Sequence, residues 1–485
     1  MVFESLFSHS QQQPDRLAVI DEQGRHSYQK VAALASGLAA HFSSQTQRSH
    51  IGLLLPPGLG SVASFYGALL AGKTVVPINY LLGDREISHI ITDSGIDTIV
   101  TIPFFIGRLS GMPINLVDLT KINQLSSDTA GSPLPHPSPA DIAVLLYTSG
   151  TSGLPKGVLL TYNNLESVVS AAIQHAGLQP THTFLGIIPL FHSFGITTML
   201  GAVRLGAPTV YLARFSPVAT LNAIREHRPS LIFGIPSMYN ALLRMKDIKP
   251  EDFSGVYATV SGGEPLPATL REAFLQRFGI PLYEGYGLTE TCAVIAMNTP
   301  LASKPGTVGK LLPGTEARFM DDVGVPVAQG EAGEIWLRGP MIMKGYHNLP
   351  AETAASLTAD GFFKTGDLGT IDSDGFLRIS GRKKDLIIVS GENVYPREIE
   401  EVLARHPAVG EVAVLGKKDA GRGEVVVAFV MPREGSAPSV EELRGFARNE
   451  GLAQWKIPRD IFIVPDLPRS PTGKVLRREL AKQLA

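Results

Sequence analysis

Residues 147–157 of the chain read YTSGTSGLPKG, and this stretch decides what the surrounding sequence builds. It places two hydroxyl-plus-glycine repeats and a lysine between a strand-like run at 142–147 and an apolar run that resumes at 158. Phosphate oxygens accept hydrogen bonds from hydroxyl groups, from backbone N–H groups and from an ammonium group, and this stretch supplies all three. The alternative is a flexible Ser/Gly surface loop, but such a loop does not usually end in Pro-Lys-Gly and continue as a strand. We therefore predict a phosphate-binding loop.

The common nucleotide-binding motifs do not account for this loop. The chain has no G-x-x-x-x-G-K-[ST] pattern, and the run from Gly285 to Glu290, GYGLTE, lacks the third glycine of a dinucleotide fingerprint. A G-x-S-x-G nucleophile elbow is also missing. We therefore expect a phosphate-binding loop that differs from the P-loop and from the dinucleotide-binding loop.

Short apolar runs alternate with helical patterns along most of the chain. Runs at 51–55, 142–147 and 231–235 read as buried strands, and the segments 165–173 and 267–278 read as amphipathic helices. This alternation predicts an α/β fold. Asn163 and Glu166 predict a capping-box start for the helix after Thr161, directly downstream of the phosphate loop.

The chain divides into a large and a small part. Residues 125–140 are dense in Ser and Pro and predict an exposed connector between subdomains of the large part. A charged run at 381–385 marks a hinge, so we expect an N-terminal domain over 1–383 and a small, mobile α+β C-terminal domain over 384–485. In the latter, Pro396 opens a helix, and 412–415 and 425–430 read as strands.

Composition excludes several classes of function. Lys plus Arg total 43 against 45 Asp plus Glu, without long single-sign runs, so no nucleic-acid partner is expected. The only cysteine, Cys292, rules out an internal disulfide framework and Cys-rich zinc sites and fits a reducing cytoplasm. The N-terminus lacks the pattern of a secretory signal, and polar residues interrupt the apolar stretch 185–203. We expect a cytoplasmic protein without an integral membrane segment.

Eight motifs in a fixed order resemble those of the acyl-adenylate-forming superfamily, which includes acyl-CoA synthetases, firefly luciferases and the adenylation domains of nonribosomal peptide synthetases. They cover nearly the whole chain, and their order makes the resemblance specific. The motifs lie at 67–77, 147–157, 191–195, 261–264, 286–290, 366–367, 381–396 and 471–474.

The resemblance implies that the chain binds ATP and Mg²⁺ and assigns roles to individual residues. Thr289 resembles the hydroxyl that contacts the nucleotide phosphates, and Glu290 the carboxylate that helps to hold Mg²⁺, a cation that keeps water and phosphate oxygens as further ligands. Asp367 resembles the acid that accepts both ribose hydroxyls, with Arg382 beside it. The other implied nucleotide contacts are Thr148, Ser149, Gly150, Thr151, Ser152, Gly153, Lys156, Gly263, Glu264, Tyr286 (which flanks the adenine) and Gly287.

The C-terminal domain supplies two further expected roles. Lys474 resembles the catalytic lysine that enters the main domain during adenylation, where a cation assists attack on an anionic α-phosphate. The lysine obstructs the second step, so in the family the small domain rotates between the two; Lys384 aligns with the hinge. Gly391 resembles the small residue that lets the pantetheine arm of coenzyme A (CoA) pass. Taken singly, each has a bland alternative: a solvated tail lysine for Lys474, and a turn glycine for Gly391.

The acid is expected to be a medium- or long-chain fatty acid or a bulky aryl acid. An α-amino acid is not expected: the peptide-synthetase domains that the chain resembles have an Asp in the motif at 192–195, where it pairs with the substrate ammonium group, and this chain has no acid there. Gly287 stands where relatives that use short acids have Trp, and Phe233, Ile235 and Met238 add an apolar neighbourhood. His192 is expected to gate this pocket, with a packed core histidine as the alternative.

Three functional readings remain from the sequence. The leading one is an acyl-CoA synthetase that uses a small carboxylic acid, ATP and CoA. The second is a fatty-acyl-AMP ligase that loads an acyl carrier protein, although the insertion typical of such enzymes is missing. The third is a non-catalytic nucleotide-binding relative, which we would expect to have lost Glu290 or Lys474. The light-emitting branch of the superfamily stays open, and the motifs do not address the oligomeric state.

Overall fold

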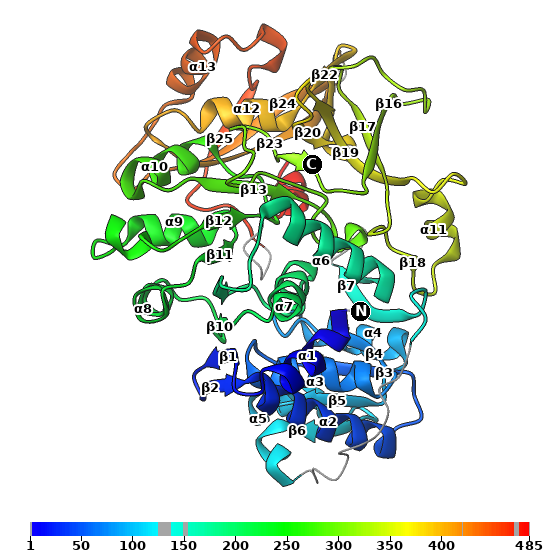
Figure 1. The fold of residues 1–485 in the computed structure, drawn as a ribbon. Coiled ribbons are helices and arrows are strands. Elements are labelled where there is room, and N and C mark those ends of the chain that lie inside the picture. Colours follow the sequence, from blue (N-terminus) through cyan, green and yellow to red (C-terminus); the bar gives the residue numbers. More distant parts are fainter. Residues whose placement is uncertain (1, 125–136, 149–153, 420, 470–474, 485) are drawn as a thin grey trace.

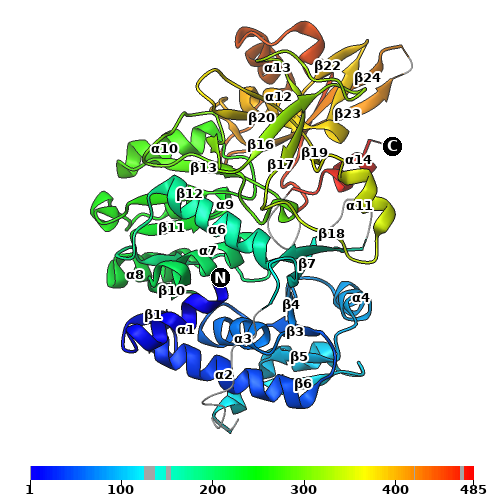
Figure 2. The same cartoon turned by 45° about the vertical axis from the view of Figure 1, so that its right-hand side comes forward.

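The computed structural model describes residues 2–124, 137–148, 154–419, 421–469 and 475–484. Over these residues the chain forms a mixed α/β structure in which sheets and helices alternate, as the sequence predicts. The N-terminal part lies at the bottom of Figure 1, a second sheet with its helices lies in the middle, and the C-terminal domain lies at the top; Figure 2 shows the same order from the side.

The first sheet contains β7 and β8, the strands on either side of the predicted phosphate loop. Its inner strands run parallel, while β8 and β18 pair antiparallel at one edge, in the order β18-β8-β7-β4-β3-β5-β6. The strands are β3 (His50–Leu54), β4 (Thr74–Pro77), β5 (Thr98–Thr101), β6 (Asn115–Asp118), β7 (Ile142–Thr148), β8 (Lys156–Thr161) and β18 (Gly345–Tyr346). The helices of this part are α1 (Val2–Gln12), α2 (Tyr28–Gln45), α3 (Leu59–Leu70), α4 (Asp84–Ser94) and α5 (Pro103–Ile106).

The second sheet is parallel in its centre and has the order β15-β14-β13-β12-β11-β9-β10-β1-β2. Its strands are β1 (Leu17–Asp21), β2 (Gly24–Ser27), β9 (Phe184–Gly186), β10 (Thr209–Tyr211), β11 (Leu231–Gly234), β12 (Ala258–Ser261), β13 (Leu282–Tyr286), β14 (Ala296–Met297) and β15 (Lys310–Leu311). The associated helices are α6 (Tyr162–Ala176), α7 (Ser193–Leu205), α8 (Pro217–His227), α9 (Pro236–Arg244) and α10 (Ala268–Phe278). Because β1 pairs with β10 and β2 pairs with β1, this N-terminal segment belongs to the second sheet, although the chain enters the first sheet directly after it.

Helix α6 begins where the sequence predicts, but with a different cap. The N-cap is Thr161, whose hydroxyl accepts from the Asn164 backbone N–H at 3.1 Å, while the Asn164 side chain accepts from the Thr161 backbone N–H at 2.9 Å. The expected pair of Asn163 and Glu166 is therefore wrong, because both residues already lie inside the first turns of the helix. The apolar stretch 185–203 runs from β9 through a loop at 187–192 into α7.

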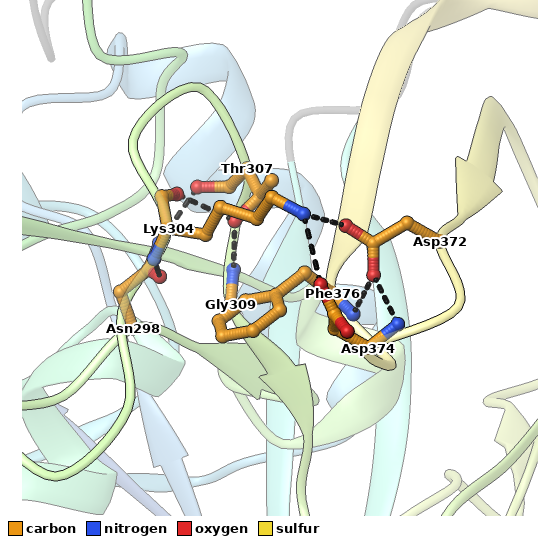
Figure 3. Close-up of polar contacts among 7 residues, drawn as sticks. All are labelled: Asn298, Lys304, Thr307, Gly309, Asp372, Asp374 and Phe376. Carbon is orange, nitrogen blue, oxygen red and sulfur yellow. Dashed lines mark hydrogen bonds and ion pairs between the residues drawn. The ribbon is translucent and has the colours of Figure 1, made fainter.

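A third sheet, antiparallel in the order β16-β17-β19-β20, closes one side of the large domain. It consists of β16 (Glu316–Met320), β17 (Gly333–Arg338), β19 (Phe363–Ile371) and β20 (Leu377–Arg382), and α11 (Pro350–Ser356) precedes β19. Figure 3 shows how its β19–β20 turn is fastened: the Lys304 ammonium donates to Asp372 at 2.7 Å and to Asp374 at 3.3 Å. Lys304 belongs to the loop that Asn298 and Thr307 brace, so this loop and the third sheet are held together.

The C-terminal domain has its own sheet and core. Strands β21 (Ile387–Val389), β22 (Glu392–Val394), β23 (Val409–Asp419), β24 (Gly423–Pro432) and β25 (Asp460–Ile463) pack with α12 (Pro396–Leu403), α13 (Val440–Asn449) and α14 (Arg477–Lys482). Pro396 is the first helical residue of α12, where its missing N–H is harmless. The division predicted after residue 383 falls in a short 3₁₀ turn, Lys383–Asp385, and it stays a prediction.

The remaining short 3₁₀ turns lie at Gly107–Leu109, Leu119–Gln124, Pro250–Phe253, Thr289–Thr291 and Gln454–Lys456. Within the described part of the chain, we find no helix with the length and hydropathy needed to cross a bilayer.

Candidate active site

A cavity of about 2250 Å³ lies where the second sheet, the adjoining ends of β7 and β8, the third sheet and the C-terminal domain meet. The structure brings most of the predicted residues together on its wall: Thr148, Lys156, His192, Gly263, Glu264, Tyr286, Gly287, Thr289, Glu290, Asp367 and Arg382. Ser149, Gly150, Thr151, Ser152, Gly153 and Lys474 lie outside the described residues. Gly391 lies away from the cavity wall, in the turn between β21 and β22 with φ +89°, so a turn explains this glycine here.

Asp367 connects the second and third sheets at the end of the cavity where the sequence predicts the nucleotide. Its side chain is buried, and the Tyr286 hydroxyl donates to its Oδ2 at 2.6 Å while the Arg382 Nε lies 2.8 Å from its Oδ1. A buried carboxylate needs such partners, and each oxygen keeps a lone pair for a further donor. Burial, with the charge of Asp367, raises the pKa of Tyr286, so its hydroxyl stays a donor at neutral pH. Tyr286 and Arg382 thus hold the Asp367 carboxylate in place, and a carboxylate held in this way can accept hydrogen bonds from a diol such as ribose.

Lys156 and Glu290 lie at the other side of this end. Lys156 begins β8 opposite Thr148 in β7, and its ammonium group forms an ion pair with Glu352 of α11. Glu290 sits in the 3₁₀ turn Thr289–Thr291, which Leu288 caps by donating its backbone N–H to the Thr291 hydroxyl at 2.9 Å. Thr289 is the first residue of this turn.

The Glu290 carboxylate is suited to Mg²⁺. One oxygen, Oε1, accepts from the Tyr346 hydroxyl at 2.9 Å, and Oε2 has no partner among the described residues. The described residues contain no group of three or more His, Cys, Asp or Glu side chains that could enclose a metal ion. A single carboxylate oxygen with phosphate and water oxygens is an arrangement that Mg²⁺ commonly accepts, so these residues fit the predicted ion.

His192 lies just before α7 on the cavity wall, with its ring centroid 4.6 Å from that of Phe191. Burial lowers the pKa of His192 to about 4. The imidazole is therefore neutral at physiological pH, and it can donate or accept a hydrogen bond without attracting an anion as a cation would.

An apolar extension of the cavity, the acyl slot, runs between helices α6 and α7 and the second sheet. Each of the two helices contributes one face to the slot, because the lining residues recur every three or four positions. They are 169, 172, 173 and 176 on α6, and 194, 197, 198 and 201 on α7. The slot residues are Val169, Ala172, Ile173, Ala176, Phe184, Phe194, Thr197, Thr198, Gly201, Leu231, Phe233, Ala258 and Val260. No charged side chain is among these described residues.

The sequence analysis predicted only part of the lining of this slot. Phe233, Ile235 and Met238 line the cavity as expected, whereas the α6 and α7 faces were missed, although their spacing and small residues were visible in the sequence. The structure also gives a different reason for Gly287: a Cβ there would lie 2.1 Å from the Ala293 carbonyl oxygen, so close backbone approach requires glycine. The open space lies instead at Gly201, where a Cβ would meet no atom within 4 Å.

The C-terminal domain closes the cavity. Arg397 of α12 lies 3.6 Å from Glu284, a buried carboxyl on β13. Burial raises the pKa of Glu284 and the charge of Arg397 opposes this shift. Arg469 and Val475, on either side of the undescribed residues that include Lys474, also line the cavity, and Arg469 forms an ion pair with Glu411.

Comparison with known proteins identifies the family. Residues 6–347 match the family described as AMP-binding enzyme, and residues 398–474 match its C-terminal domain. This chain belongs to the AMP-binding enzyme family. The resemblance to acyl-adenylate-forming enzymes and the α/β fold are thereby confirmed.

Two curated members of the AMP-binding enzyme family resemble the chain over almost its full length. The long-chain-fatty-acid–CoA ligase of Bacillus subtilis is 34% identical over 97% of this chain and 92% of its own. The 2-succinylbenzoate–CoA ligase of Bacillus velezensis is 35% identical over 98% of this chain and 96% of its own. The predicted class, an AMP-forming acid–thiol ligase, is confirmed by these relatives.

The fold of the family is also found in solved structures. The O-succinylbenzoate coenzyme A synthetase from Bacillus subtilis, in complex with ATP and magnesium ion, superposes with a TM-score of 0.89 at 32% identity and covers 99% of both chains.

Proposed function

We propose that this protein is an acyl-CoA synthetase that activates an apolar carboxylic acid with ATP and transfers the acyl group to CoA. In the first step a carboxylate oxygen attacks the α-phosphate and pyrophosphate leaves. In the second step the CoA sulfur attacks the acyl carbon, AMP leaves and the thiol proton is lost. The observation that carries this proposal is that the acyl slot opens into the cavity that holds Asp367, Glu290 and Lys156.

The nucleotide end supports ATP and Mg²⁺ as the reactant and metal. Tyr286, Asp367 and Arg382 offer the ring, the carboxylate and the cation that adenosine and its phosphates need. Glu290 would hold the metal ion, and Mg²⁺ would neutralise phosphate charge there. The related O-succinylbenzoate synthetase was solved with ATP and magnesium, which supports the same pair here.

The slot supports a fatty acid or an aryl acid without a second charge. It is lined by apolar side chains, glycine and two threonines, and Phe233 lies 5.7 Å from Phe184 and 6.0 Å from Phe194 between ring centroids. A second carboxylate on the acid would be buried there without a cation, which is unfavourable. Of the two relatives named above, one is a ligase of long-chain fatty acids and the other a ligase of succinylbenzoate. The apolar lining of the slot favours a long-chain fatty acid.

The acceptor and the domain movement complete the proposal. CoA is favoured over an acyl carrier protein because the named relatives are CoA ligases. Lys474 would serve adenylation and Gly391 the CoA step, with rotation about residues 383–384 between them. The lone cysteine supports a cytoplasmic location.

A panel of acids with ATP and CoA tests this function. Straight-chain acids of increasing length, aryl acids, succinylbenzoate and amino acids would be compared by pyrophosphate release and by the mass of the thioester. We expect pyrophosphate and acyl-CoA with fatty or aryl monocarboxylic acids. Pyrophosphate release with thioester formation only on a carrier protein would favour the ligase alternative, and no acid-dependent pyrophosphate release would contradict the proposal.

A further inference from the structure

Tyr346 lies between the two charged side chains that face the phosphate end of the cavity. Strand β18 pairs antiparallel with β8, and the register places Tyr346 opposite Val158, close to Lys156. The Tyr346 hydroxyl donates to Glu290 Oε1 at 2.9 Å, and the Lys156 Nζ lies 6.0 Å from the centroid of the same ring. The sequence motifs do not include this tyrosine.

The backbone around Tyr346 is fixed from both sides. Met343 donates its N–H to the Glu290 carbonyl at 2.8 Å, and His347 donates to the Gly157 carbonyl at 2.8 Å. The Tyr346 N–H donates to the Thr353 hydroxyl at 2.9 Å. The segment 343–347 is therefore fastened to the Glu290 turn and to the strand after the phosphate loop, so the ring has little freedom to turn away.

The preceding residue shows how closely this segment is packed. Gly345 has φ +151°, a conformation that favours glycine, and a Cβ there would lie 2.7 Å from the Thr353 Cγ2. Thr353 belongs to α11, the helix whose Glu352 forms the ion pair with Lys156. The segment 343–347 thus contacts Glu290 through Tyr346 and packs against α11, the helix whose Glu352 pairs with Lys156.

We propose that Tyr346 is a positioning residue for the adenylation step: its hydroxyl holds Oε1 of Glu290, so that Oε2 is presented to the metal ion that accompanies ATP. This inference rests on the proposed function only in assigning Mg²⁺ to Glu290. The hydroxyl restricts a flexible glutamate to one orientation before the ligand arrives, which reduces the ordering that binding must supply.

Tyr346→Phe tests the inference because it removes the hydroxyl and keeps the ring, the β18 pairing and the contact with Lys156. The dissociation constant of ATP is measured by calorimetry with Mg²⁺ and, separately, in EDTA, without any acid substrate. We expect ATP binding to weaken five- to tenfold with Mg²⁺, where tenfold corresponds to about 1.4 kcal/mol. In EDTA we expect binding within about twofold of the unmodified protein.

Tyr28→Phe is the matched control. It removes another tyrosine hydroxyl, one that donates to the Ala207 carbonyl at 3.1 Å in the core and does not line the cavity. We expect it to leave ATP binding unchanged in both conditions. An equal loss of affinity with Mg²⁺ and in EDTA for Tyr346→Phe would reveal a merely structural role and overturn the inference.

A double-mutant cycle with Glu290→Gln separates this inference from the proposed function. If Tyr346 acts through Glu290, Tyr346→Phe should have no further effect on Mg²⁺-dependent ATP binding in the Glu290→Gln background. Additive losses would overturn the inference. If the unmodified protein binds ATP equally with Mg²⁺ and in EDTA, the assignment of the metal to Glu290 fails, and with it the positioning role.

Discussion

Gly201→Leu should shorten the acids that the enzyme accepts. Gly201 is buried in α7 and lines the acyl slot, yet a Cβ there would meet no atom within 4 Å. A leucine side chain would therefore extend into open slot space rather than into the protein. If it displaces about three methylene groups of a bound chain, at about 0.8 kcal/mol each, binding weakens by about 2.4 kcal/mol, or roughly 60-fold.

The assay is kcat/KM for a series of straight-chain acids at saturating ATP and CoA. Acids that end before Gly201 should be used as before, and those that pass it should lose about 60-fold. Replacing a helical glycine also favours the fold, by about 0.5–1 kcal/mol, so the melting temperature should not fall. Gly37→Leu is the control, because Gly37 is also helical with open space around it but lies in α2, away from the cavity. A uniform loss for all chain lengths, or no change, would refute this account of the slot.

Three further outcomes are expected. Lys474→Ala should abolish acid-dependent pyrophosphate exchange and largely spare thioester formation from preformed acyl-AMP; equal loss of both half-reactions would contradict its assignment to adenylation. Asp367→Asn should weaken ATP binding in calorimetry by about tenfold or more, since it removes the charge that Arg382 and Tyr286 share; unchanged affinity would argue against a ribose site. Burial lowers the pKa of His192 from 6.5 to about 4, so between these pH values the unfolded chain binds more protons and stability falls as the pH falls. Urea unfolding at about pH 7 and about pH 5 should therefore show a smaller pH dependence for His192→Asn, and an unchanged slope would contradict a neutral buried imidazole.

The fold, and the residues that gather at one end of the cavity, could be predicted because these residues occur in local motifs. Each of these residues lies in a short motif, and the order of the motifs along the chain constrains the topology. The motifs are the predicted phosphate loop, the run from Tyr286 to Glu290, and Gly366 with Asp367. Their geometry was not predictable in the same way. The hydrogen bond from Tyr286 to Asp367 joins residues 81 positions apart, and only the packing of the second sheet against the third brings them together.

The acyl slot and Tyr346 could not be found by motif reasoning. Slot residues come from two helices and several parallel strands, each of which reads as ordinary core when taken alone. Tyr346 reaches Glu290 because β18 joins the edge of the first sheet beside β8, and a two-residue strand has almost no signal in sequence. The cap of α6 shows the same limit on a smaller scale. Thr161 and Asn164 form the capping box, although the pair Asn163 and Glu166 has side chains that are equally able to form one.

Oxygen transfer from the acid tests the central claim most directly. A carboxylic acid from the accepted range, labelled with ¹⁸O in its carboxyl group, is turned over with ATP and CoA, and the masses of AMP and of pyrophosphate are measured. Attack of the carboxylate on the α-phosphate predicts one ¹⁸O atom in the phosphate of AMP and none in pyrophosphate. Unlabelled AMP, or label released in inorganic phosphate together with ADP, would contradict acyl-adenylate formation at this site.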